Sequence, residues 1–339
     1  MASLSRQLAQ WVVGLRYEDL PPDVVDRAKG VTLQGLASVL LGSLTPGGRQ
    51  AVKLISEEEA GVKHGATIMV DGARVTRGGA AFANAEMAMA GGKWDTFRML
   101  THPGTSIIPG AFVAAETAGA SGRDFLTGLA AGYEVMERMA ADFIPTVMAR
   151  GFHAGVVFGI FGPAVAAAKI MGLTEDQVNS TIALCASLAA GNLEGARSGG
   201  RALREGGAVR NAMLAVALAR QGHAGGETVL EGDAGFYHAY AGNNQGRLTH
   251  SFVGDTQTSL DKITAAPSRR ARPPLRAPSR LPLARLAQRA IVLFTWSSVN
   301  PITFAAATAA PKMPNTGPAW NPRAITVGMK SAAMRSATS

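Results

Sequence analysis

Titratable and hydroxyl side chains gather in a segment rich in glycine and proline, residues 91–109, GGKWDTFRMLTHPGTSIIP. It places Asp95, Thr96 and His102 between two stretches that we expect to be helical. Because the first N–H groups of a helix lack intrahelical partners, a polar loop entering a helix offers hydrogen-bond donors to an anion. The alternative interpretation is a solvent-exposed connection in which His102 has no chemical role.

His153 stands directly before an apolar run, residues 154–168, that predicts a helix. The positive end of a helix dipole disfavours an imidazolium ion, so a neutral imidazole would be available there as a base. A purely structural helix cap is the alternative.

Four arginines lie in the glycine-rich segment 195–210, GARSGGRALREGGAVR, and Arg201 and Arg204 are two of them. Guanidinium groups bind carboxylates in a bidentate manner, and glycines let backbone approach a ligand. No GxxxxGK[ST] phosphate loop is present, and a solvated charged face is the alternative. The segment 230–240, with His238, is typical of a structural turn. No two histidines have HxxxH or HExxH spacing, so we expect neither a metal nor another cofactor.

Helical periodicity extends over most of the chain to about residue 254. Val24, Ala28, Val31, Gly35 and Val39 recur at helical spacing after a Pro-Pro start signal. Serine or threonine with an acid or amide three residues later predicts helix starts at residues 121 and 174.

Asp71-Gly72 between two apolar runs predicts one hairpin. Alanine- and glycine-rich helices without βαβ alternation indicate a compact helical bundle, a mainly α fold.

The net charge of +9 belongs to the end of the chain. From residue 261 onward, 12 lysines and arginines face a single acid, and the first 260 residues carry −2. With no aromatic interleaving or binding motif, this distribution disfavours a nucleic-acid partner. The start of the chain lacks the pattern of a secretory signal, and the longest uncharged run is too short for a membrane span. We expect a cytoplasmic protein with no membrane partner, whose one cysteine, Cys185, is buried and inert.

Ten of the 17 prolines lie beyond residue 260, where Asp261 is the single acidic residue. We therefore divide the chain into a helical domain, residues 1–256, and an atypical tail rich in proline, arginine and alanine, residues 257–339, that is poorly ordered. An out-of-frame translation would give such a tail. Translating the other two frames of the gene beyond codon 255 tests this hypothesis.

Four motifs in order along the chain resemble the MmgE/PrpD family. They are the WDT…THPG loop, GYEVMER (132–138), the segment 150–191 beginning RGFHAGVVFG, and LEGDAGFYHAY (230–240). The resemblance covers residues 3–256. The family includes 2-methylcitrate dehydratases, cis-aconitate decarboxylases and an iminodisuccinate epimerase. The resemblance implies a large all-helical domain followed by a smaller α/β lid domain, which is here missing or garbled, and a homodimer with the site between the domains.

Family positions carry over residue by residue. Asp95 and Thr96 match the end of the family's acidic loop motif, His102 matches the histidine of its HP[SG] motif, and His153 matches the histidine of GFH. The family's first loop aspartate corresponds to Gly92, so one expected carboxylate is missing.

Arg201 falls where the family commonly has an active-site lysine, and Arg204 where a histidine commonly follows. Both replacements favour carboxylate binding over proton transfer.

The resemblance therefore implies a cofactor-independent lyase, a hydro-lyase like 2-methylcitrate dehydratase, that removes a proton next to a carboxylate of a small di- or tricarboxylate. The expected catalytic residues are His102, His153 and Asp95, and the expected substrate-binding residues are Thr96, Arg201 and Arg204. Epimerisation or decarboxylation of a related acid stays open. A catalytically inactive helical dimer also stays open.

Overall fold

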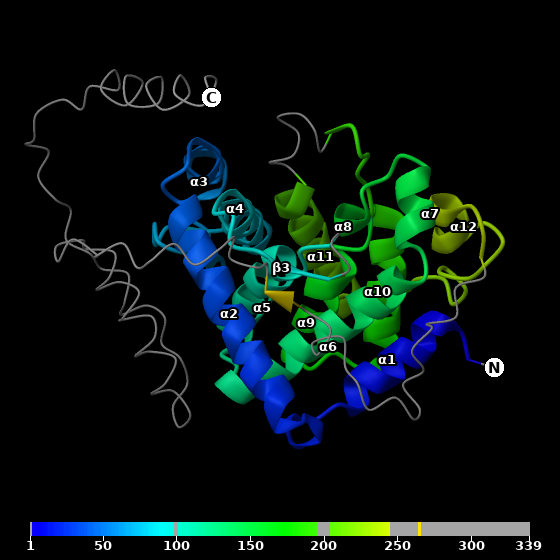
Figure 1. Ribbon diagram of the computed structural model, residues 1–339. Coiled ribbons are helices and arrows are strands. Elements are labelled where there is room, and N and C mark those ends of the chain that lie inside the picture. Colours follow the sequence, from blue (N-terminus) through cyan, green and yellow to red (C-terminus); the bar gives the residue numbers. More distant parts are fainter. Residues whose placement is uncertain (1, 98–100, 196–203, 245–263, 266–339) are drawn as a thin grey trace, which may run out of the picture. The chain divides into compact units, whose positions relative to one another are not determined.

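The computed structural model describes residues 2–97, 101–195, 204–244 and 264–265. The chain divides into two units, 1–304 and 305–339, and every described residue belongs to the first. Most of the tail, 257–339, lies outside the described residues. The described residues are mainly helical, as predicted (Figure 1).

The first half of the chain contributes these elements: α1 (Leu4–Gly14), the 3-10 turn η1 (Tyr17–Asp19), α2 (Pro22–Gly42), α3 (Pro46–Glu59), β1 (Ala66–Thr67), β2 (Arg74–Val75), α4 (Arg77–Ala90), β3 (Asp95–Thr96), α5 (Gly104–Ala118) and α6 (Gly122–Ala141). The remaining elements are α7 (Ile144–Ala149), α8 (Ala154–Val157), α9 (Phe161–Ile170), α10 (Glu175–Leu188), α11 (Arg204–Arg220), α12 (Phe236–Ala241) and β4 (Thr264–Ala265).

Several of these helices begin and bury their residues as the local sequence patterns predicted. The five residues predicted to form one face of a helix are all buried on α2. Ser121 with Asp124 and Thr174 with Gln177 both form capping boxes, at the starts of α6 and α10. Each box satisfies backbone N–H groups that a helix start would otherwise leave without partners.

The predicted hairpin is also present. β1 and β2 pair in antiparallel register, Ala66 opposite Val75 and Thr67 opposite Arg74. Gly72 lies in the connection with a φ of 86°, in the left-handed region that glycine enters without steric cost.

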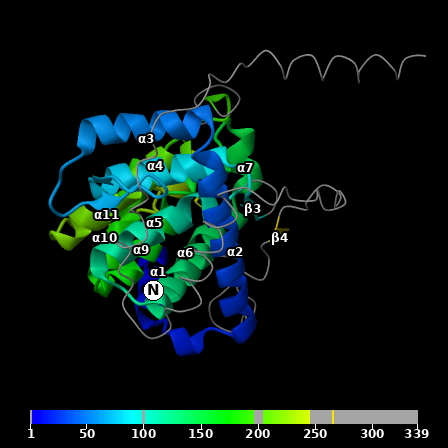
Figure 2. The same ribbon diagram turned by 90° about the vertical axis from the view of Figure 1, so that its left-hand side faces the viewer.

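Helices α5, α6, α9 and α11 pack around a common core, and α4 lies between α2 and α11 (Figures 1 and 2). Small residues allow the close approach that the alanine- and glycine-rich sequence predicted. At the crossing of α6 and α9, a Cβ atom on Gly132 would lie 2.5 Å from the carbonyl oxygen of Gly162. These backbones therefore touch at a spacing that no larger residue allows.

The apolar run 154–168, predicted as one helix, is divided in the structure. α8 ends at Val157, residues 158–160 form a turn, and α9 begins at Phe161. Pro163 explains the break, because proline has no N–H to donate and fits the first turn of a helix rather than its interior. His153 therefore stands before a four-residue helix.

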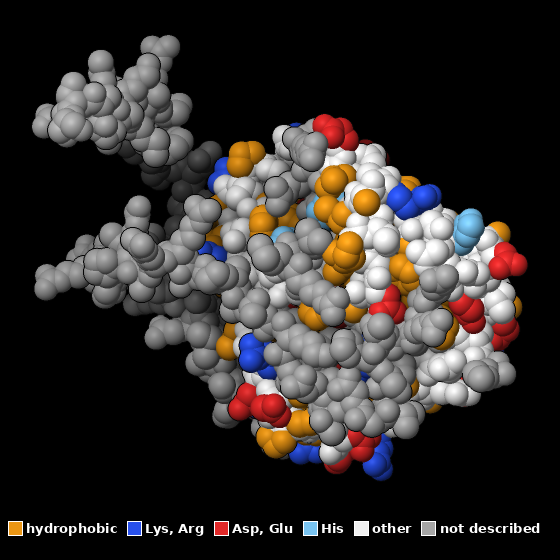
Figure 3. Space-filling view, turned by 45° about the vertical axis from the view of Figure 1, so that its right-hand side comes forward, with side chains coloured by type: hydrophobic (Ala, Val, Ile, Leu, Met, Phe, Trp, Pro, Cys, Tyr) orange, Lys and Arg blue, Asp and Glu red, His pale blue; other side chains and the backbone are white. Residues whose placement is uncertain are grey.

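Within the described residues, no helix is long and apolar enough to cross a membrane. On the face drawn in Figure 3, acidic and basic side chains of the described residues are interspersed rather than separated by sign. This agrees with the near-neutral charge of the first 260 residues.

Candidate active site

The polar loop of the sequence analysis connects α4 to α5 and begins with the short strand β3. β3 pairs in antiparallel register with β4, Asp95 opposite Ala265 and Thr96 opposite Thr264. Phe97 and Thr101 form an isolated bridge, with backbone hydrogen bonds of 3.2 and 3.3 Å. The loop is therefore held by backbone pairing on both sides of residues 98–100, which lie outside the described residues.

The carboxylate of Asp95 is buried, with 3% of the residue exposed. It accepts the backbone N–H of Gly104, at 2.9 and 3.1 Å to its two oxygens, and the hydroxyl of Tyr133 at 2.5 Å. Gly104 is the first residue of α5, so the carboxylate satisfies a donor at a helix start. Asp95 thus ties β3 to α5 and α6.

Burial raises the pKa of Asp95 to about 6, because the charged form loses its hydration. The hydrogen bonds from Tyr133 and Gly104 act in the opposite direction, since both stabilise the ionised form. Burial, followed by the Asp95 charge, raises the pKa of Tyr133 well above its ordinary value. Tyr133 therefore keeps its proton and remains a hydrogen-bond donor.

The imidazole of His102 lies against β3. Its Nδ1 is 3.0 Å from the carbonyl oxygen of Asp95 and 3.3 Å from the hydroxyl oxygen of Thr96. A carbonyl oxygen can only accept, so we assign the proton to Nδ1, which makes Nε2 the nitrogen suited to accept a proton. The Trp94 ring lies beside the imidazole, with ring centroids 4.7 Å apart.

Three predicted site residues, Asp95, Thr96 and His102, thus come together in one cluster. Asp95 contacts His102 through its main-chain carbonyl, whereas its carboxylate bonds Tyr133 and Gly104. The expected orienting role of Asp95 therefore rests on its backbone. Thr96, expected to bind substrate, also contacts the imidazole.

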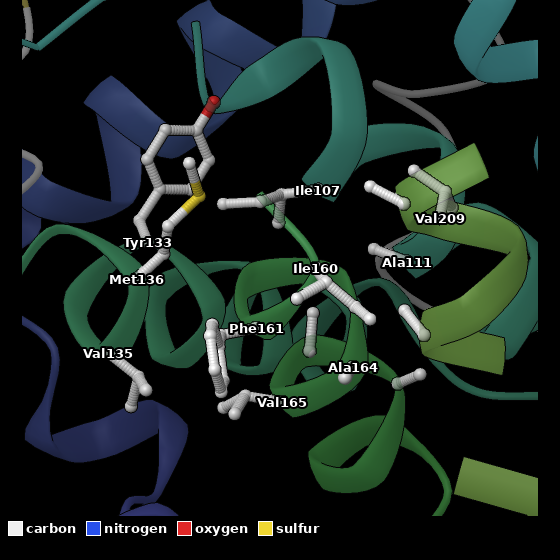
Figure 4. Packing of buried hydrophobic residues seen from close by; sticks show 14 of the residues in the cluster. Ile107, Ala111, Tyr133, Val135, Met136, Ile160, Phe161, Ala164, Val165 and Val209 are labelled. Carbon is white, nitrogen blue, oxygen red and sulfur yellow. The ribbon is translucent and has the colours of Figure 1, made fainter. Parts of the chain in front are cut away.

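Helix α6 supports the loop at two points one turn apart. Tyr133 bonds Asp95, and Glu137, which is fully buried, accepts the hydroxyl of Thr101 at 3.0 and 3.1 Å. Figure 4 shows the Tyr133 ring on α6 with its hydroxyl pointing away from Phe161. We assigned no role to either residue from sequence. GYEVMER places Tyr133 and Glu137 four residues apart, on one face of a helix, and this spacing was the available signal.

His153 is the N-cap residue of α8 and is partly buried. Its backbone N–H donates to the carbonyl of Gly191 at 3.2 Å, and the N–H of Leu193 donates to the carbonyl of Gly151 at 2.7 Å. These bonds join the His153 segment to the residues that lead into the arginine-rich segment.

Arg201 lies outside the described residues, and Arg204 begins α11, with its side chain likewise outside. The start of α11 is positioned by a contact missed from sequence. Glu86 of α4, 3% exposed, accepts the N–H of Gly206 at 2.9 Å. α11 also contacts α5 and α8, so it packs against the helices that follow His102 and His153.

A cavity of about 370 Å³ lies elsewhere, between α4, the second half of α5 and α11. Its lining includes Arg77, Thr117 and Arg210, but not Asp95, Thr96, His102 or His153. In segment 230–240, interpreted from the sequence as a structural turn, α12 begins at Phe236. Tyr237 stacks on Phe143 with centroids 4.4 Å apart, and His238 is exposed.

In this helical body, His102 lies between the strand that carries Asp95 and the start of α5. The sequence model of the MmgE/PrpD N-terminal domain matches residues 6–249. The chain belongs to the MmgE/PrpD family.

Several curated proteins are similar to it. A cis-aconitate decarboxylase-like protein of Aspergillus oryzae is 28% identical over 271 residues, which are 77% of this chain and 56% of that protein. The cis-aconitate decarboxylase of Aspergillus terreus is 27% identical over 68% of this chain and 48% of its own length. The human cis-aconitate decarboxylase is 28% identical over 71% of this chain and 51% of its own length. The chain spans about half the length of the curated relatives it matches.

Proposed function

We propose that this protein is a cofactor-independent lyase of a small di- or tricarboxylate, in which His102 transfers a proton at the carbon next to a carboxylate. The observation that carries the proposal is the contact between His102 Nδ1 and the Asp95 carbonyl, because it leaves Nε2 as the proton-accepting nitrogen. Membership of a family that includes cis-aconitate decarboxylases supports the substrate class.

In a dehydration, the base takes a proton from the carbon beside one carboxylate. The electrons of the C–H bond form the new double bond, and the neighbouring C–O bond breaks. The hydroxyl leaves as water after it receives a proton from an acid. Cationic groups stabilise the enediolate that develops on the carboxylate, and we assign this role to Arg201 and Arg204. His153 is the second acid–base group in this proposal.

The test is incubation of the full chain with methylcitrate, cis-aconitate and iminodisuccinate, each followed by proton NMR. Dehydration gives new alkene signals, and epimerisation in heavy water gives deuterium exchange without a new alkene. If none of the three acids changes while the protein shows a cooperative thermal transition, the lyase proposal is wrong. The chain would then be a helical scaffold without activity.

Variants assign the proton transfer to His102. Asn at position 102 keeps a donor near the Asp95 carbonyl but removes Nε2, so His102→Asn should lower kcat by at least about a hundred-fold. His153→Asn should lower kcat as well if His153 supplies the second acid–base group. The control is His238→Asn on α12, where the ring is exposed and turnover should stay near that of the wild type.

Decarboxylation is the second candidate, favoured by the names of the relatives. Here a C–C bond to a carboxylate breaks, CO2 leaves, and the electron pair moves into the conjugated double bond and remaining carboxylate. A protonated group then delivers a proton to carbon, so His102 would act as an acid rather than a base. Release of CO2 from cis-aconitate distinguishes this candidate from dehydration. A homodimer also stays a prediction, which light scattering would test.

A further inference from the structure

The buried hydroxyl of Tyr133 makes a contact that packing alone does not require. Tyr133 has no exposed surface, and its hydroxyl donates to Asp95 Oδ2 at 2.5 Å. A phenylalanine would fill the same space, whereas a hydroxyl placed in an apolar core is costly unless it is hydrogen-bonded. The short distance is typical of a hydrogen bond to an ionised acceptor.

That contact is one step from the histidine. The Asp95 carboxylate is held from α6 by Tyr133 and from α5 by the N–H of Gly104. The carbonyl of the same residue lies 3.0 Å from His102 Nδ1. Because the side chain of Asp95 is fixed at two points, its carbonyl is fixed as well, and the imidazole is aligned against it.

We infer that Tyr133 is a positioning residue, which acts through Asp95 to hold the imidazole of His102 in the tautomer with the proton on Nδ1. The inference deepens the proposed function, on which its catalytic consequence rests. Tyr133 suits this role because burial keeps its pKa high, so that it donates to Asp95 whether or not nearby groups titrate. The groups that face Asp95 are Tyr133 from α6, the Gly104 N–H from α5, and His102 within the loop.

The direct test is nitrogen NMR of isotope-labelled histidine in the full chain. The His102 signals are assigned by their loss in His102→Asn. In the wild type, the Nδ1-protonated tautomer should dominate. In Tyr133→Phe, the ratio of the two tautomers should fall by about ten-fold, the value of one lost hydrogen bond. A folded Tyr133→Phe protein with an unchanged tautomer ratio overturns the inference.

Tyr237→Phe is the matched control. Tyr237 is also buried, and its ring stacks on that of Phe143. Neither residue belongs to the loop that carries Asp95 and His102. The same chemical change should leave the His102 tautomer unchanged. If both variants shift the ratio equally, a general loosening of the core is responsible and the inference is overturned.

A second variant covers the case in which Tyr133→Phe does not fold. A ring-fluorinated tyrosine at position 133 keeps the hydroxyl but makes it a stronger acid and thus a stronger donor. Movement of the His102 nitrogen signals in response supports the link through Asp95. Signals identical to those of the wild type contradict it.

The tautomer measurement needs no turnover, so it separates this inference from the proposed function. If no carboxylate is converted, the proposed function fails while the tautomer ratio still decides the role of Tyr133. If turnover is found, Tyr133→Phe should lower kcat by about ten- to a hundred-fold and change KM little, because the imidazole is misaligned while the substrate contacts remain. An unchanged kcat in a folded variant would count against the inference.

Discussion

Thr101 and Glu137 are joined by a buried hydrogen bond, in which the threonine hydroxyl lies 3.0 and 3.1 Å from the two carboxylate oxygens. Neither residue has exposed surface. Thr101 directly precedes His102, and Glu137 lies one turn beyond Tyr133 on α6. The helix therefore fixes the histidine loop on both sides of residues 98–100.

Thr101→Val removes the hydroxyl and leaves a buried carboxylate with one partner fewer. We expect the free energy of unfolding to fall by about 1–3 kcal/mol, measured by urea denaturation. Thr127→Val is the control. The Thr127 hydroxyl donates to the carbonyl oxygen of Arg123 in the same helix, at 2.8 Å, and not to a buried carboxylate. A smaller loss at position 101 than at 127 would contradict the account.

Gly104→Ala should disrupt the start of α5. The added Cβ would lie 2.8 Å from the Tyr133 hydroxyl oxygen and 2.9 Å from both Asp95 carboxylate oxygens. We expect a loss of about 1–3 kcal/mol in unfolding free energy, since two buried polar groups, the Tyr133 hydroxyl and the Asp95 carboxylate, must shift. Gly122→Ala at the start of α6 has open space around the new Cβ, and it should be neutral or stabilising by up to about 1 kcal/mol. Equal effects of the two changes would show that the crowding at Gly104 is unimportant.

The stability of the fold should depend on the protonation of Asp95. Burial raises its pKa to about 6 from the ordinary 3.8, so the folded chain holds a proton that the unfolded chain has already released. The stability that this proton contributes is fully present below about pH 4 and is lost as pH rises through about 6. Relative to Asp95→Asn, the wild type should lose on the order of 2–3 kcal/mol of unfolding free energy over this range.

Urea denaturation at a series of pH values measures that difference. Asp19 supplies a control of opposite sign, because the Arg16 guanidinium lowers the pKa of Asp19. Its contribution is present above the ordinary pKa and is lost as pH falls. Parallel curves for the wild type and Asp95→Asn would rule out the assigned shift.

Cys185 should resist thiol reagents in the folded protein. It is fully buried, as predicted, and burial raises the pKa of its thiol, so almost no thiolate is present near neutral pH. Reaction with a chromogenic disulfide should be negligible under native conditions and complete in concentrated guanidinium. Rapid reaction of the native chain would mean that α10 opens readily around this residue.

Local signals were sufficient to predict much of the helical body. The capping boxes at Ser121 and Thr174 depend on residues three positions apart, and the α2 face depends on spacing within one helix. Such patterns can be read without knowledge of the tertiary fold. The break after Val157 was not predicted, because residues 154–168 are apolar without interruption. That pattern does not show that Pro163 ends the helix in the turn before it.

The cluster around His102 was predictable in part. Its three loop members lie within eight residues of one another, so their proximity follows from the sequence. The hydrogen bond from Tyr133 to Asp95 joins residues 38 positions apart, and the one from Gly206 to Glu86 joins residues 120 positions apart. Both depend on helix packing that no local pattern encodes. Arg201 and the side chain of Arg204 lie outside the described residues, so their predicted carboxylate contacts stay predictions.

Because the apolar run is divided into α8 and α9, the two candidate histidines are attached to elements of different length and stability. His102 is backed by α6, most of whose residues are buried, whereas His153 precedes a helix of four residues and is tied to its neighbours by backbone bonds at Gly191 and Gly151. Residues 151–153, which carry His153, are exposed or partly buried, and such segments open locally at lower free energy than core helices do. Amide protons around His153 should therefore exchange with solvent sooner than those of α6, and adaptation to ligands of different size would begin on that side.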